Sequence, residues 1–135
     1  MSDPVAGYAP SLEDLATIAE RAFAHLPEGF RKLAGDVIFR VDDFPADEVL
    51  DDLGIEDPFE LTGLYSGASL RERSAFGPEA EPSRVFLYRR PILDEWAERG
   101  DVTLEELVTH VLVHEIGHHF GLSDPDIEAI EAAGE

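Results

Sequence analysis

Apolar residues recur at three- and four-residue intervals near the start of the chain, which is the spacing of one face of a helix. These apolar positions are Leu12, Leu15, Ile18, Ala22 and Phe23. Ser11 precedes them and Asp14 follows Ser11 by three residues, as in a capping box. The pattern therefore predicts an amphipathic helix over residues 11–25, which Pro27 and Gly29 end.

Shorter apolar runs, rich in Val, Ile, Phe, Leu and Tyr, predict strands in the middle of the chain. The predicted strands cover residues 36–43, 61–66 and 83–90, and short helices are predicted over residues 46–53 and 92–99. Pro78 and Pro82 lie among acidic residues and predict an exposed loop over residues 77–83. Strands and helices mix without strict alternation, which is typical of the α+β class with a small sheet.

A second capping box, Thr103 with Glu106, opens the longest predicted helix, which runs from residue 104 to about residue 120. One broad arc of this helix is apolar, and it consists of Leu104, Leu107, Val108, Val111, Leu112 and Ile116. Glu115 falls near the middle of that arc. A carboxylate buried there needs a cation, strong hydrogen-bond donors or protonation, because an isolated buried charge is costly.

The composition predicts one folded domain. The chain has 135 residues, 44% of them hydrophobic, which suffices for a single core. We expect a flexible tail over residues 1–10 and one compact domain over residues 11–135. The net charge of −20 argues against nucleic acid and anionic membranes as partners, because both require clustered Lys and Arg.

The absence of cysteine excludes a thiolate zinc site and a cysteine nucleophile, and it fits a reducing compartment. The first ten residues lack the basic and apolar regions of a secretory signal, and no apolar run reaches the length of a membrane span. We therefore expect a cytoplasmic protein.

Residues 114–124 read HEIGHHFGLSD, which is the pattern HExxHxxGxxD. On a helix, His114 and His118 lie about 40° apart around the axis and about 6 Å apart along it, so both imidazoles can reach one metal ion. Gly121 can end the helix in a left-handed conformation and return the chain, so that Asp124 becomes a third ligand. Two histidines and one carboxylate leave one zinc position open, as in a catalytic site.

Glu115 is rotated about 100° from His114. It therefore stands beside the ion without binding it and is the predicted general base. A structural ion pair with Arg73 or Arg84 is the alternative role for Glu115.

The other motif residues also have structural alternatives. Asp124, followed by Pro125 and an apolar helical pattern, has the position of an N-cap. The alternative for His114 and His118 is a pair of buried, hydrogen-bonded core histidines. His119 is interpreted as a core histidine, with support of the neighbouring ligand as its alternative role, and His110 as a surface or supporting residue that does not bind the metal.

Three segments together resemble the small bacterial zincin-like metallopeptidase family, sometimes called minimal zincins. They are residues 64–74 (LYSGASLRERS), residues 85–93 (VFLYRRPIL) and residues 114–124. The likeness extends over residues 11–133. It implies a compact zincin-like domain in which a small mixed sheet packs on the metal-bearing helix and an N-terminal helix. It also implies that His114, His118 and Asp124 bind one Zn²⁺ and that Glu115 is the base. The only methionine is Met1, so the Met-turn of metzincins is absent.

The predicted function is a zinc-dependent peptidase that acts on peptide or protein substrates. An extended peptide is expected to bind along a sheet edge, formed by residues 61–66 or by residues 85–89. Tyr65, Tyr88 and His119 are candidates to stabilise the transition state. The alternative is a metal-binding protein-interaction module with weak or no catalytic activity.

Overall fold

The computed structural model describes residues 9–66 and 83–133, which form an α+β fold, as predicted. Its elements in chain order are α1 (Leu12–Ala24), α2 (Glu28–Ala34), β1 (Val37–Asp42), α3 (Asp47–Leu53), the 3₁₀ turn η1 (Pro58–Glu60), β2 (Gly63–Ser66), β3 (Ser83–Tyr88), α5 (Arg89–Arg99), α6 (Leu104–His119) and α7 (Asp124–Ala133). All three predicted strands are present. Residues 77–82 of the predicted loop and nearly all of the predicted tail lie outside the described residues, and Ser83 is the first residue of β3.

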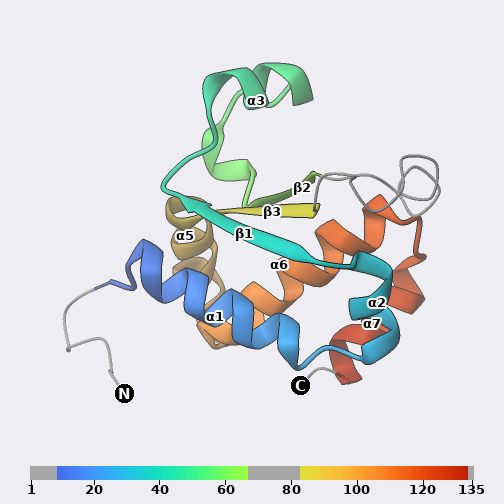
Figure 1. Ribbon diagram of the computed structural model, residues 1–135. Coiled ribbons are helices and arrows are strands. Elements are labelled where there is room, and N and C mark those ends of the chain that lie inside the picture. Colours follow the sequence, from blue (N-terminus) through green and yellow to red (C-terminus); the bar gives the residue numbers. More distant parts are fainter. Residues whose placement is uncertain (1–8, 67–82, 134–135) are drawn as a thin grey trace.

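The strands form a mixed sheet in the order β1-β3-β2. The central strand β3 pairs with β1 in parallel and with β2 antiparallel. Helices α1 and α6 lie on one side of this sheet and α3 lies on the other (Figure 1). The sheet therefore packs on the metal-motif helix and the N-terminal helix, as the zincin-like resemblance implied.

Helix α6 is the centre of the hydrophobic core. All six residues of its predicted apolar arc are buried, and Leu112 and Ile116 are fully buried. They pack with Leu15 and Ala19 of α1 and with Val85 and Leu87 of β3 in one cluster. Full burial of a large aliphatic side chain contributes roughly 1.5–3 kcal/mol, so this packing fixes α6 against the sheet.

Both predicted capping boxes are present. The Ser11 hydroxyl accepts a hydrogen bond from the Asp14 amide at 3.0 Å, and the Thr103 hydroxyl accepts one from the Glu106 amide at 3.0 Å. The Glu106 carboxylate in turn accepts from the Thr103 amide at 2.9 Å, and this bond holds the pKa of Glu106 below its usual value. The boxes fix the first residue of α1 and of α6.

One helix boundary differs from the prediction, and one helix was not predicted. Helix α5 begins at Arg89 and contains Pro91 in its first turn, where a helix leaves amide groups without internal acceptors, so the missing proline N–H costs little. Helix α2 forms despite Gly29, because it buries Phe30 and Ala34. Tertiary packing there outweighs the cost of a helical glycine, about 1 kcal/mol.

No helix in residues 9–66 or 83–133 is long and apolar enough to cross a membrane.

Candidate metal centre

Three histidines lie at four-residue intervals along α6: His110, His114 and His118, hereafter the histidine row. The ring centroids of His110 and His114 are 4.0 Å apart, and those of His114 and His118 are 5.5 Å apart. The two predicted histidine ligands therefore lie side by side, as their spacing requires. Helix α7 supplies a carboxylate to each end of the row, from Asp124 and Glu131.

At the C-terminal end of the row, His118 lies next to Asp124. His118 Nε2 is 3.6 Å from Asp124 Oδ1, and the two side chains are 55% and 83% exposed. The structure thus brings together two of the three predicted ligands in a position open to solvent. Two imidazoles and one carboxylate are a donor set that suits a catalytic zinc ion, so these residues fit the metal that the motif implies.

The start of α7 distinguishes between the two roles considered for Asp124, which are metal ligand and N-cap. Ser123 is the capping residue: its hydroxyl accepts from the Asp126 amide at 3.3 Å, and Asp126 accepts from the Ser123 amide at 3.4 Å. Asp124 is already the first helical residue. The alternative in which Asp124 is the N-cap is therefore wrong, and its carboxylate faces His118 instead.

At the other end of the row, His110 lies against Glu131. His110 Nδ1 is 2.6 Å from Glu131 Oε1, and His114 Nε2 is 3.6 Å from Glu131 Oε2. Ligand atoms of these three residues all lie within 4.8 Å of one another, and no other group of metal-ligand side chains in the described part of the chain is gathered so closely. The set of His114, His118 and Asp124 is less closely gathered.

Sequence reasoning missed Glu131 and assigned His110 no ligand role. One signal for His110 was present, because it precedes His114 by four residues, as His114 precedes His118. Glu131 follows Asp124 by seven residues, which is two helical turns and places both on one face of α7.

The Glu115 side chain is half-buried, and it forms no hydrogen bond or ion pair within the part of the chain that the structure describes. The alternative ion pair between Glu115 and Arg84 does not form, and Arg73 lies outside the described residues. Burial raises the pKa of Glu115, and the neighbouring His118 opposes this rise. The desolvated carboxylate of Glu115 therefore stands beside the predicted ligand His118, on the helix face that the sequence pattern predicted.

The surroundings of His114 favour its neutral form. Burial lowers its pKa, and the neighbouring His110 and His118 rings lower it further, while Glu131 opposes them. Neutral imidazole is the form that binds a metal ion. The middle residue of the row is thus suited to be a ligand.

A family model described as zincin-like metallopeptidase matches residues 34–133, well over half of the chain. The chain belongs to this family. No curated protein matches it in sequence. The match runs from the residues just before β1 through α7, so the sheet, the histidine row and both α7 carboxylates are part of the zincin-like region.

Near the zincin motif, His119 does not have the core position that was predicted for it. Its side chain is exposed, and its ring lies 4.3 Å, centroid to centroid, from the ring of Tyr65 on β2. The Tyr65 hydroxyl donates to Ser83 Oγ at 2.5 Å, deep in the sheet. Tyr65 therefore supports His119 with its ring while its hydroxyl is already engaged.

Gly117, inside the zincin motif, sets how closely α7 approaches α6. A Cβ atom added to it would lie 2.9 Å from Ile127 Cγ1, and Ile127 is fully buried. Only a glycine leaves room for Ile127 at this distance. The contact places α7, and with it Asp124 and Glu131, along the histidine row.

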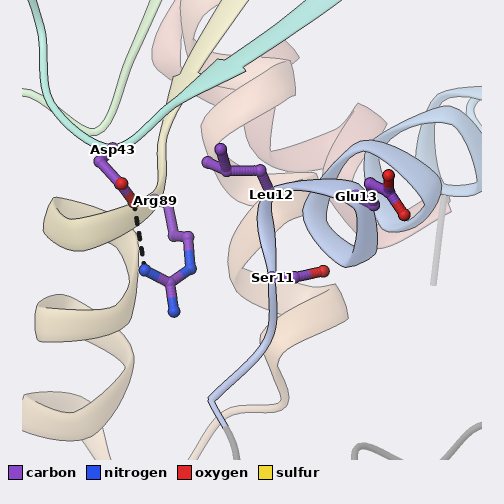
Figure 2. Close-up of a pocket in the computed structure, with 5 residues that line it drawn as sticks. All are labelled: Ser11, Leu12, Glu13, Asp43 and Arg89. Carbon is purple, nitrogen blue, oxygen red and sulfur yellow. Dashed lines mark hydrogen bonds and ion pairs between the residues drawn. The ribbon is translucent and has the colours of Figure 1, made fainter.

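A cavity of about 400 Å³ lies away from the row, lined by Ser11, Leu12, Glu13, Asp43 and Arg89 (Figure 2). Arg89 donates to the Pro10 carbonyl at 2.6 Å and pairs with Asp43 at 3.1 Å. The start of α1 lies on the left of Figure 1, whereas the C-terminal end of α6 lies on the right, so the cavity is separate from the metal centre.

Proposed function

We propose that this zincin-like protein is a zinc-dependent peptidase in which Glu115 is the general base. The observation that carries this proposal is the desolvated Glu115 carboxylate next to His118. His114, His118 and Asp124 would hold the ion, and their donor types match a three-ligand catalytic zinc site. Family membership supports a metal-dependent hydrolase.

When bound, zinc supplies a Lewis acid that polarises the scissile carbonyl and acidifies a neighbouring water. Glu115 accepts a proton from the attacking water and delivers it to the leaving amine. Burial favours the protonated form of Glu115, which makes its carboxylate a stronger base than an exposed glutamate.

The substrate is proposed to bind along β2. Of the two predicted sheet edges, the one at residues 85–89 is wrong, because β3 pairs on both sides. Strand β2 is at the edge of the described sheet, and its Tyr65 contacts His119 near the motif. An extended peptide that adds to β2 would therefore be led towards the histidine row.

His119 is the favoured transition-state stabiliser among the three candidates. Tyr88 is buried and lies at the opposite end of β3 from Ser83, whose hydroxyl contacts Tyr65. The Tyr65 hydroxyl is engaged with Ser83, whereas His119 has an exposed side chain and directly follows the predicted ligand His118 in the chain. His119 can donate a hydrogen bond to the oxyanion from its ring.

A metal-binding interaction module without catalysis is the second candidate. It is favoured by the group of His110, His114 and Glu131, whose ligand atoms gather without any role for Glu115. This candidate predicts zinc binding that does not lead to peptide cleavage.

The test compares wild type with Glu115→Gln on a broad peptide library, with zinc content and helical circular dichroism measured in parallel. We expect cleavage to fall about 10²- to 10⁴-fold while fold and zinc are retained, because the substitution removes only the proton acceptor. Glu105→Gln, at an exposed position of the same helix, is the matched control and should keep full activity.

If the wild type cleaves no peptide in the library while it binds zinc, the interaction module replaces the enzyme. Equal cleavage by wild type and Glu115→Gln would exclude Glu115 as the base.

A further inference from the structure

The group of His110, His114 and Glu131 has the chemistry of a metal site in its own right. It offers two imidazole nitrogens and a carboxylate, all partly buried. Ligands about 2.0–2.2 Å from a tetrahedral zinc ion lie about 3.5 Å from one another. Since the three ligand atoms already lie within 4.8 Å of one another, small side-chain rotations complete the site.

Two of the three ligand atoms are already joined by a hydrogen bond. His110 Nδ1 and Glu131 Oε1 are 2.6 Å apart, which is a hydrogen bond between the two ligand atoms. A divalent ion would take the place of this hydrogen bond, because each ligand atom must be deprotonated to bind it. Nitrogen and oxygen donors of this kind suit zinc and its transition-metal neighbours.

Glu115 lies on the other side of the row. Around the axis of α6 it stands about 60° from His118 and about 140° from His110. In agreement, His118 is the residue whose charge acts on the pKa of Glu115. An ion bound between His110 and Glu131 is therefore turned away from the proposed base.

We propose that His110, His114 and Glu131 form a second divalent-cation site, which shares His114 with the predicted site. His114 Nε2 faces Glu131, and the predicted site would use the same nitrogen, so one ion would occupy the two sites in turn. One consequence rests on the proposed function. An ion in the second site lies away from Glu115, so the peptidase is inactive while the ion stays there.

The experiment is a zinc titration of four full-length proteins, each checked by circular dichroism. They are wild type, His118→Ala/Asp124→Asn, His110→Ala/Glu131→Gln and His114→Ala. The first double variant keeps only the second site, and the other double variant keeps only the predicted site. Nuclear magnetic resonance of the histidine rings reports which imidazole responds. A fifth protein, His25→Ala, removes the one histidine that lies outside α6 and controls for adventitious binding.

We expect His118→Ala/Asp124→Asn to retain one zinc ion per chain and the His110 ring signals to shift when zinc is added. His114→Ala should lose the ion, because both sites need it. The second site is refuted if the folded His118→Ala/Asp124→Asn protein loses zinc as completely as His114→Ala, or if His114→Ala binds as well as wild type.

The two proposals fail separately. Loss of zinc from His118→Ala/Asp124→Asn, with cleavage and zinc retained in His110→Ala/Glu131→Gln, removes the second site and leaves the peptidase. Zinc retained in His118→Ala/Asp124→Asn, with no cleavage by any protein, supports the second site and removes the peptidase. If both proposals hold, His110→Ala/Glu131→Gln should cleave faster than wild type at limiting zinc.

Discussion

The two ends of the histidine row differ in the distance between the histidine and its carboxylate partner and in the exposure of these side chains. The His110–Glu131 pair is 2.6 Å apart, and its side chains are 34% and 21% exposed. The His118–Asp124 pair is 3.6 Å apart, and its side chains are 55% and 83% exposed. The end with the recognisable motif is thus the looser and more open one.

This difference separates what a site needs for stability from what it needs for reaction. A partly buried, hydrogen-bonded pair fixes α7 against α6, since such a bond is shielded from water. In the proposed peptidase a substrate must reach the ion, so the end that binds it has to be open, and exposed charge pairs contribute little to stability. We infer that the His110 end holds the helix pair together and that the His118 end carries the reaction.

The largest expected effect comes from removing the contact between Ile127 and Gly117, because this contact positions α7 and both of its carboxylates along the histidine row. Ile127→Ala should destabilise the protein by about 2–5 kcal/mol, because it leaves a cavity where the fully buried side chain packs on Gly117. Urea unfolding measures this loss, and zinc affinity should fall with it because α7 carries both carboxylates. Ile130→Ala, at a partly buried position of α7, is the control and should cost less. Equal losses would mean that the Gly117 contact does not hold α7 in place.

The next effect distinguishes the two ends directly. Glu131→Gln should lower the free energy of unfolding by about 1 kcal/mol, because it weakens a shielded hydrogen bond. Asp124→Asn should change it by less than about 0.5 kcal/mol, as exposed substitutions usually do. Both are measured by urea unfolding in the presence of a chelator. A larger cost for Asp124→Asn would reverse the assignment of the ends.

The smallest expected effect is a pH dependence of the free energy of unfolding that arises from Glu115. The folded-state pKa of Glu115 is raised above its ordinary value of 4.5, so the folded protein binds this proton more tightly than the unfolded chain. Its contribution to stability is full below pH 4.5 and is lost as the pH rises through the folded-state pKa. Glu115→Gln removes that loss and should therefore gain stability relative to wild type between acid and neutral pH. Urea unfolding of the metal-free proteins across this range measures the difference, and a constant difference would contradict the desolvation of Glu115.

The sequence predicted the features that depend on neighbouring residues. The capping boxes at Ser11 and Thr103 and the apolar arc of α6 are local signals, and the structure has them where they were expected. Helix α2 was missed because the burial of Phe30, which stabilises it, depends on the rest of the fold.

In the metal centre, too, the sequence predicted the features that are local and missed the one that depends on the fold. The motif placed His114, Glu115 and His118 on one helix, since their spacing is local. The His110–Glu131 contact spans 21 residues and forms only because α7 folds back over Gly117. No helical periodicity within α6 alone could have indicated it.

The central claim is that zinc binds beside a free Glu115 on this helix. The most direct measurement is an anomalous-scattering crystal structure of the wild type soaked with zinc and a peptide that carries a chelating hydroxamate. We predict one ion bound by His114, His118 and Asp124, with the chelating group in the open position next to an unligated Glu115. Imidazoles of His114 and His118 that point apart while zinc binds elsewhere, or a Glu115 that itself ligates the ion, would contradict the account.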